Sequence, residues 1–372
     1  MQHSILSRHT DGAFRYQAWP TITKGEDGTL YVATSGHRLN HVCPFGKNLM
    51  YVSKDEGKTW SCPQIINDTY LDDRDAGLLA WGDGNLLLTY FSTPADRFDT
   101  FDLEDGKPHV NVRSTLAMGM REIWDSLPKD AMRPGCFTRI SRDNGLTWSE
   151  PRPAPVSSPH GPCRLEDGTL LFVGTIVMDG GVFESPDYAT RIQMFQSKDD
   201  GETWEYLSHI PMPEGADQGC HEPHAIQMAN GDILVAVRYE NTYTPVMKSL
   251  RVYTTISHDK GKTWEKSQFH DDQHGAPSHL LQHSSGAVIL SYSRRLEPMG
   301  QYVQISYDYG KTWSSEAMLA PQDSTELPAW DHGYPSSVEL RNGDILTLYY
   351  QKCPGDAYCS LHTVRWSLDE IK

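Results

Sequence analysis

The sequence contains no long apolar segment and no cluster of basic residues. No apolar run approaches the 18 residues that suggest a membrane-spanning helix. The 372 residues include 33 Lys and Arg against 49 Asp and Glu, which gives a formal net charge of −16. Because nucleic-acid binding depends on a basic surface, neither a nucleic acid nor a membrane is expected as a partner.

Cysteine is scarce, and paired C-x-x-C spacing is absent. The seven Cys are an odd, scattered set: Cys43, Cys62, Cys136, Cys163, Cys220, Cys353 and Cys359. This pattern favours reduced thiols over a disulfide framework. The first residues, MQHSILSRHTDG, also lack the apolar core of a signal peptide. The sequence as written therefore predicts a cytoplasmic protein, or a secreted or periplasmic one if a signal sequence was removed.

What the chain does contain is an internal repeat. The string S-x-D-x-G-x-T-W occurs five times, at 53–60, 141–148, 197–204, 257–264 and 306–313. The Asp can bond to nearby backbone amides and the Gly can adopt positive φ, so the string predicts a tight turn. The Thr-Trp pair would begin a strand whose indole packs between neighbouring sheets. By itself this box is a structural repeat and not an active site.

A second turn alternates with the box. It is a Gly between β-rich runs, mostly Asp-Gly or Asn-Gly, and recurs at Gly28, Gly84, Gly168, Gly231, Gly286 and Gly343. Such pairs between β-rich runs predict hairpins. Six turns and five boxes indicate six repeated units of about four strands each. The fold class expected is therefore all-β, a six-bladed β-propeller formed by residues 1–372 as a single domain.

Two details of the propeller follow from the spacing. Four turn-to-box distances lie between 20 and 29 residues, but Gly84 and Ser141 are 57 residues apart. The second blade should therefore carry an insertion at about 92–135, in which MGMREIWDSLPKD has the pattern of a short helix. Such insertions often project from the binding face. The N-terminal segment, through about Phe14, should supply an outer strand that closes the ring with the last blade.

Equivalent positions on the six inner strands can be compared by counting back nine residues from each turn Gly. These positions are Trp19, Asp75, Pro159, Glu222, Pro277 and Tyr334. Inner strands converge on the propeller axis, so the six residues should form a ring at one end of the central channel. Neighbouring positions add His160, His224 and His279. Such polar residues either carry chemistry or fill the channel with water-linked contacts.

The boxes, the six units and two inner-strand motifs resemble the sialidase (neuraminidase) superfamily. In that family a Glu nine residues before a hairpin Gly is followed by an Arg on the next strand, as in EPHAIQMANGDILVAVR with Glu222 and Arg238. The family's Tyr precedes its last hairpin Gly, as Tyr334 does in YPSSVELRNG. The resemblance covers the whole chain at the level of repeats.

The resemblance implies an exo-glycosidase that removes a terminal sialic acid or related acidic sugar with retention. Tyr334 would be the nucleophile, and Glu222 would accept its proton. Retaining glycosidases generally use two carboxyl groups, and a Tyr nucleophile is the exception found in sialidases. Arg238 would bind the substrate carboxylate with two parallel hydrogen bonds. Arg294 or Arg295 would supply a second guanidinium for binding the substrate carboxylate. No cofactor and no metal are expected.

Two expected family residues are missing. Ala18 stands where the family has its first Arg, so Arg15 or Arg38 would have to substitute. The loop that carries the family's general acid reads TSGHRLNHVCPFGK, with His37 and His41 but no carboxylate. The best replacement is LDDRDAG, where Asp72, Asp73 and Asp75 surround Arg74. A partly desolvated Asp75 would keep the proton that a leaving group needs, although this cluster can also be an ion-pair network.

The candidate site residues can be stated together. Tyr334, Glu222 and Asp75 are the catalytic candidates. The substrate-binding candidates are Arg238, Arg295, Arg294, Arg74, Arg38, Asp73, His37, His160, His224, His279 and Trp19.

Two other function classes remain open. A lyase acting on uronates could use His160, His224 or His279 as base and Tyr334 as acid. The same His set lacks a metal-binding spacing such as H-x-x-x-H. The third class is a glycan-binding propeller without catalysis, which would be expected to lose the Tyr334–Glu222 pair. The identity of the sugar and the oligomeric state are not predicted.

Overall fold

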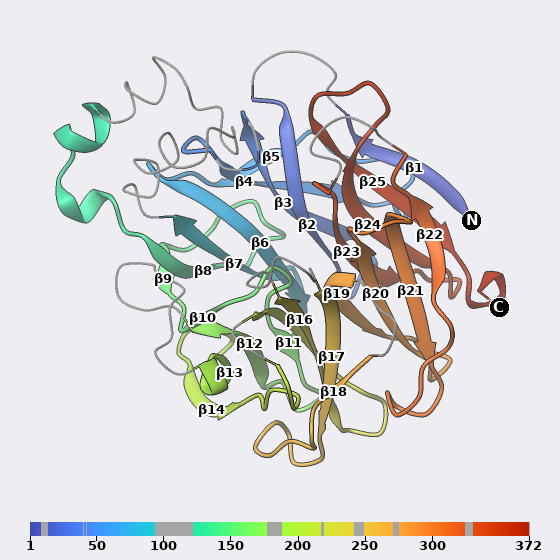
Figure 1. Cartoon of the computed structure of the whole chain (residues 1–372). Helices are drawn as coiled ribbons and strands as arrows, with labels where there is room; N and C mark the ends of the chain where they lie inside the picture. The colour runs from blue at the N-terminus through green and yellow to red at the C-terminus, as the bar shows by residue number, and fades with distance from the viewer. Residues whose placement is uncertain are drawn as a thin grey trace.

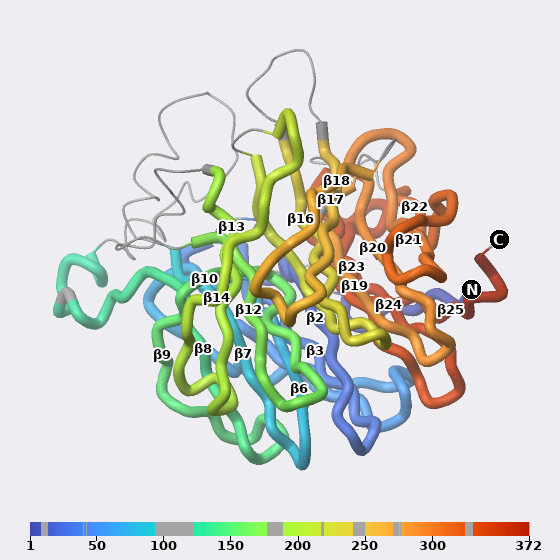
Figure 2. Tube along the Cα trace, turned by 90° about the horizontal axis from the view of Figure 1, so that it is seen from below, coloured from blue at the N-terminus to red at the C-terminus, as the bar shows by residue number. Residues whose placement is uncertain are grey.

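The structure is a computed structural model that describes residues 1–8, 14–39, 41, 43–93, 122–176, 188–216, 219–241, 249–270, 275–323 and 330–371. Within these residues the strands form six antiparallel sheets. The inner strands of neighbouring blades contact one another, and the last inner strand contacts the first. Figures 1 and 2 show the sheets arranged around a common centre. The predicted six-bladed propeller is confirmed.

The first three blades follow one another along the chain. Blade 1 contains β2 (Tyr16–Lys24), β3 (Leu30–Arg38), β4 (Lys47–Ser53) and β5 (Gln64–Asn67). Blade 2 contains β6 (Asp72–Trp81), β7 (Asn85–Thr93), β8 (Gly135–Ser141) and β9 (Arg152–Pro153). Blade 3 contains β10 (Val156–Ser157), β11 (Cys163–Arg164), β12 (Leu170–Ile176), β13 (Ile192–Ser197) and β14 (Glu205–His209). In this blade alone the inner strand is divided in two, because β10 and β11 both pair with β12.

The last three blades complete the ring. Blade 4 contains β15 (Cys220–Gln227), β16 (Ile233–Asn241), β17 (Ser249–Ser257) and β18 (Gln268–Phe269). Blade 5 contains β19 (Gly275–Gln282), β20 (Val288–Arg294), β21 (Gly300–Ser306) and β22 (Ala317–Pro321). Blade 6 contains β23 (Gly333–Glu339), β24 (Ile345–Lys352), β25 (Cys359–Trp366) and β1 (Gln2–Ser7). Because β1 pairs with β25 as the outer strand, the N-terminus closes the ring as predicted.

Helical structure is sparse in the described residues. The short 3-10 turns are η2 (Lys129–Ala131), η3 (Tyr188–Thr190) and η4 (Leu368–Glu370). The predicted insertion lies between β7 and β8 of blade 2, and its described part contains helical residues 122–126. Trp124 Nε1 donates to the backbone oxygen of Tyr70 at 2.7 Å, which attaches this part to the connection before β6. Residues 94–121 lie outside the described residues. No helix in the described part of the chain is long and apolar enough to cross a membrane.

The five boxes have the same turn geometry. In the first, Thr59 donates its backbone N–H and its hydroxyl to the Asp55 carboxylate at 2.9 and 2.6 Å, and Gly57 N–H donates to Ser53 Oγ at 2.9 Å. The same bonds recur in the other four boxes. The residue before each box Gly, such as Glu56 at φ +61°, has a left-handed backbone. The boxes are therefore turns between the third and fourth strands.

The hydrophobic core is divided among the blade interfaces. Each box Trp packs partly buried against the cluster that joins its own blade to the preceding one: Trp60, Trp148, Trp204, Trp264 and Trp313. Blade 6 has no box, but Trp366 on β25 lies in the corresponding cluster between blades 5 and 6, with 1% of its surface exposed. A Trp from a different strand therefore fills the sixth interface.

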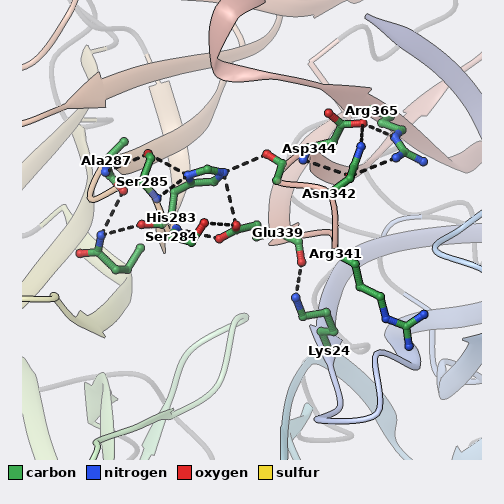
Figure 3. A network of polar contacts seen from close by, with 12 residues as sticks. Lys24, His283, Ser284, Ser285, Ala287, Glu339, Arg341, Asn342, Asp344 and Arg365 are labelled. Carbon is green, nitrogen blue, oxygen red and sulfur yellow. Dashed lines mark hydrogen bonds and ion pairs between the residues drawn. The ribbon is translucent and has the colours of Figure 1, made fainter.

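A polar network joins blades 5, 6 and 1 at the end of the propeller where the hairpin turns lie (Figure 3). His283 Nε2 lies 2.9 Å from the backbone oxygen of Gly343, and Ser284 N–H donates to Glu339 at 2.8 Å. Lys24 donates to the backbone oxygen of Glu339. These contacts link successive hairpin turns and therefore stabilise this end of the propeller.

Candidate active site

Four of the six ring positions share an unusual backbone conformation. Trp19, Asp75, Glu222 and Tyr334 have φ of +53°, +50°, +50° and +53°. Each lies where the pairing of its inner strand with the second strand shifts register. A bulge of this kind re-aims a side chain, and left-handed non-glycine residues cost about 1–3 kcal/mol each and concentrate at functional sites. At the other two positions Pro159 and Pro277 cannot adopt this φ, because the proline ring fixes it near −65°.

The bulges bring Tyr334 and Glu222 together across the ring. Tyr334 Oη donates to Glu222 Oε1 at 2.5 Å. Arg238 on β16 donates to Glu222 Oε2 and to Glu240 Oε2, both at 2.6 Å. All of these contacts come from blades 4 and 6, 112 residues apart for the Tyr–Glu bond. The result is a phenol held on an ionised carboxylate, which is in turn held by a guanidinium.

The charges of this group follow from its neighbours. Burial opposes ionisation of Glu222, but Arg238 and His221 outweigh it and hold its pKa well below the usual range. Burial raises the pKa of Tyr334 well above 10, and the Glu222 charge raises it further. In the resting protein the proton therefore stays on Tyr334, and Glu222 is the acceptor.

Asp75 adds a second carboxyl group to the ring. Only 8% of the residue is exposed, and its buried Oδ1 atom has no hydrogen-bond partner among the residues that the structure describes. Burial raises the pKa of Asp75 to about 7, against the lowering effect of Arg74 and with the raising effect of Glu222. Two carboxyl groups on one ring thus differ in protonation, because one has an arginine partner and the other lacks a hydrogen bond.

Asp75→Asn tests this assignment through stability. Folded Asp75 keeps its proton up to about pH 7, whereas the unfolded chain loses it near pH 3.9. The contribution of Asp75 to stability is therefore full below about pH 4 and is lost as pH rises to about 7. Relative to wild type, Asp75→Asn should gain stability with rising pH across this window, by at most about tenfold in the unfolding equilibrium constant per pH unit. Urea unfolding at several pH values measures it.

The matched control is Asp344→Asn on the hairpin-turn face. The pKa of Asp344 is lowered by hydrogen bonds from Asn342 and Arg365, so this residue is ionised in both states above pH 4. Its substitution should shift stability by a constant amount across the window. A constant difference between wild type and Asp75→Asn would contradict the raised pKa.

Two arginines flank the Tyr334–Glu222 pair. Arg74 Cζ lies 4.2 Å from the centroid of the Trp19 ring, and the buried Arg74 Nε atom has no hydrogen-bond partner in the described part of the chain. Arg295 Cζ lies 5.7 Å from the centroid of the Tyr334 ring, and its Nε donates to the backbone oxygen of His332 at 3.1 Å. Within the described residues neither guanidinium forms an ion pair with a carboxylate. An anionic ligand can therefore bind these two cations without displacing a carboxylate, whereas Arg238 is already paired with Glu222 and Glu240.

Several candidates from the sequence are bound by other protein groups. Arg38 packs on the Trp19 ring at 4.8 Å but is completely buried, with NH1 2.6 Å from Asp72. Asp73 accepts hydrogen bonds from Thr69 and Ser92 and is also buried. Arg294 pairs with Glu316 beside the outer strand β22. These three side chains are already satisfied by protein partners.

His37 also faces away from the ring. It lines a separate cavity of about 510 Å³ at blade 1, together with Phe14, Arg15 and Lys47. It has φ of +53°, but its neighbours are not those of Tyr334. A role for His37 at the Tyr334 site is therefore not supported by its position.

The three inner-strand histidines lie below the ring and line a central cavity of about 650 Å³. His224 Nδ1 accepts from Leu280 N–H at 2.9 Å, and His279 Nδ1 accepts from Ser337 N–H at 3.3 Å. Burial lowers the pKa of His160 to about 4 and lowers the pKa values of the other two well below 6.5. These neutral imidazoles line the channel, and two of them accept hydrogen bonds from the backbone of the next blade. No group of metal-binding side chains is found among the residues that the structure describes.

The sequence did not predict a second group of contacting residues beside the ring, which is centred on His41. His41 lies in the connection between β3 and β4, and its Nδ1 is 3.0 Å from Asp331 Oδ1, although the two residues are 290 positions apart. The His41 ring packs against Trp19 and Trp330, with centroids 4.9 and 5.5 Å away. The sequence shows His41 in the loop that lacks a carboxylate, but no sequence pattern pairs it with Asp331.

Comparison with known families agrees with the repeat pattern. A family model described as "BNR repeat-like domain" matches residues 162–354, more than half of the chain. The chain belongs to the BNR repeat-like family. A search of curated proteins finds no matching sequence.

Solved structures resemble this BNR repeat-like protein over its whole length. A protein of unknown function from Dyadobacter fermentans has a TM-score of 0.72 at 21% identity, covering 98% of this chain and 99% of its own. The NanB sialidase from Streptococcus pneumoniae has a TM-score of 0.66 at 16% identity, covering 99% and 71%. The intramolecular trans-sialidase from Ruminococcus gnavus has a TM-score of 0.61 at 15% identity, covering 99% and 98%. At these identities the likeness shows the propeller fold alone and not an activity.

Proposed function

We propose that this protein is a retaining exo-glycosidase that hydrolyses a terminal sialic acid or related acidic sugar from a glycan. The observation that carries the proposal is the Tyr334–Glu222 hydrogen bond flanked by Arg74 and Arg295, two cations without carboxylate partners among the described residues. In a chain of net charge −16, such a pair next to a nucleophile favours an anionic substrate.

In the proposed reaction the Tyr334 oxygen attacks the anomeric carbon and its proton passes to Glu222. A neutral phenol suits an anomeric centre that bears a carboxylate, because two anions would repel. The low pKa of Glu222 makes it a weak base while Arg238 is bound to it. A substrate carboxylate that competes for Arg238 would weaken this ion pair and raise the basicity of Glu222. Substrate binding would thus activate the nucleophile.

Asp75 is proposed to serve the bound sugar as a protonated carboxyl group. Because its pKa is about 7, it keeps a proton in mildly acidic solution and can donate a hydrogen bond. The fold shared with solved sialidases supports this assignment by analogy only.

The direct test is a screen of 4-nitrophenyl glycosides of sialic acid, its deaminated analogue, uronic acids and the neutral sugar rhamnose. Turnover of an acidic sugar is expected, and turnover of rhamnose alone or of none would overturn the proposal. On the accepted sugar, Arg295→Gln and Arg74→Gln should each raise KM by about tenfold or more, because a charged hydrogen bond contributes about 1.5–3 kcal/mol. Arg294→Gln, which removes the pair with Glu316 and the contact with Tyr302, should leave KM unchanged. Equal KM values for all three variants would contradict a carboxylate-binding role.

A further inference from the structure

His41 is held by a buried carboxylate that has several donors. Asp331, with 2% of its surface exposed, accepts hydrogen bonds from Tyr16 Oη at 3.0 Å and from Tyr350 Oη at 3.1 Å. The Cys359 thiol lies 3.7 Å from Asp331 Oδ2. Burial opposes ionisation, but His41 and Tyr16 lower the pKa of Asp331 below its ordinary value. Asp331 is therefore an anion fixed in position by its surroundings.

This anion decides which nitrogen of His41 carries the proton. An ionised carboxylate can only accept, so the contact of 3.0 Å requires a proton on His41 Nδ1. The second nitrogen, Nε2, forms no hydrogen bond to any residue that the structure describes. A histidine whose Nδ1 is fixed by a carboxylate has its Nε2 free to accept or donate a proton.

His41 packs against Trp19, which in turn packs against the nucleophile candidate Tyr334. Trp19 separates it from Tyr334, with ring centroids 4.9 Å from His41 and 6.5 Å from Tyr334. On the other side, Trp330 packs against His41, and Arg295 lies 5.9 Å from the Trp330 centroid and 5.7 Å from the Tyr334 centroid. These five side chains form a closed circuit of ring and cation contacts. Trp330 is 38% exposed, so this side of the circuit faces outward.

The leaving group of an exo-glycosidase must also extend outward. Asp75 is 8% exposed with one oxygen buried, whereas the His41 side chain is 26% exposed between two indole rings. Aromatic rings beside a proton donor suit the glycan that departs. Position therefore favours His41 over Asp75 for contact with the glycosidic oxygen.

We propose that His41, oriented by Asp331, is the catalytic acid and base that exchanges a proton with the leaving group. The inference rests on the proposed function. In the first step Tyr334 bonds to the anomeric carbon and gives its proton to Glu222, while the glycosidic oxygen leaves with the Nε2 proton of His41. In the second step neutral His41 takes a proton from water, whose oxygen bonds to the anomeric carbon. Tyr334 then leaves and regains its proton from Glu222.

The charges around His41 fit a substrate-dependent acid. Burial lowers the pKa of His41, Arg74 and Arg295 lower it further, and Asp331 opposes them. Tyr16 is the other titratable group in contact with Nδ1, at 3.1 Å. An anionic sugar bound by the two arginines would offset their repulsion, so the imidazolium form gains stability when the substrate is present.

The test compares two leaving groups on the acidic sugar that the wild type accepts: 4-nitrophenol, which departs without protonation, and methanol, which needs it. His41→Gln should lower kcat/KM for the methyl glycoside by about 10²–10⁴-fold, and for the 4-nitrophenyl glycoside by less than about tenfold. His41→Phe keeps the ring between the indoles and should behave in the same way. His37→Gln, in the neighbouring cavity, is the matched control and should leave both values unchanged.

Asp331→Asn tests the positioning role. It should reproduce the loss on the methyl glycoside, and the alkaline limb of the pH profile of kcat should move to lower pH, because the imidazolium loses its anion. Equal losses of the His41 variants on both glycosides would overturn the proposal, as would a leaving-group-dependent loss in Asp75→Asn without one in His41→Gln. Absence of wild-type turnover on every acidic glycoside would instead refute the proposed function itself.

Discussion

Tyr334→Phe is expected to lower kcat on an aryl glycoside of the accepted sugar by on the order of 10³-fold or more. The substitution removes only the oxygen that would bond to the anomeric carbon. The ring of Tyr334 also packs against Trp19 and Tyr350, with centroids 6.5 and 5.9 Å away, and Phe keeps these contacts. KM should therefore change little, and stability should fall only by the lost hydrogen bond to the ionised Glu222, about 1.5–3 kcal/mol. Steady-state kinetics and calorimetry measure the two effects.

The covalent intermediate gives a second readout of the same change. Acid-quenched wild type should yield a peptide containing Tyr334 with the added mass of the sugar, and Tyr334→Phe should yield none. Tyr302→Phe is the control, because its hydroxyl bonds to the backbone oxygen of Pro298 in blade 5. A Tyr334→Phe enzyme with wild-type kcat would exclude a tyrosine nucleophile.

Glu222→Gln should lower kcat by about 10²–10⁴-fold, the range for loss of a general base. Its pH dependence should differ from that of wild type. The Glu222 charge raises the pKa of Tyr334, so its removal favours the phenolate. The kcat of Glu222→Gln should therefore rise with pH, as phenol ionisation in solution replaces proton transfer to the carboxylate. Kinetics between pH 5 and about 10 follow this trend.

Glu240→Gln is the matched variant on the same arginine. Glu240 accepts from Arg238 at 2.6 Å, but Tyr334 donates to Glu222 alone. The control should keep kcat within about tenfold of wild type and should show no rise with pH. Similar profiles for the two variants would mean that Glu222 acts through Arg238 and not as the base for Tyr334.

Much of the frame could be predicted from short strings. The box requires only contacts within eight residues, such as Asp55 with Thr59, and the hairpin turns need only a Gly with positive φ, as Gly28 has at +87°. Local geometry of this kind is set by the residues themselves. Their common register therefore placed Trp19, Asp75, Glu222 and Tyr334 at equivalent positions before any long-range contact was known.

In the sixth blade the repeat does not predict which residue packs against the neighbouring blade. No box follows Gly343, yet Trp366 fills the interface that a box Trp fills elsewhere. The space between two packed sheets must be filled by apolar side chains. A Trp on β25 can fill it as well as a Trp in a turn. The repeated strings predict six units, but they do not predict that Trp366 takes the place of a box Trp.

The sequence by itself determined the number of blades, the closure by the N-terminal strand, the insertion in blade 2 and the residues on the ring. Only the tertiary structure shows which arginines are paired with carboxylates. Arg38, Arg238 and Arg294 are bound by carboxylates, whereas Arg74 and Arg295 are not paired in this way among the described residues. The structure likewise joins His41 to Asp331 across 290 residues. The physical reason is that turns are specified by neighbours in the chain, while ion pairs and buried carboxylates depend on which blades the closed ring brings together.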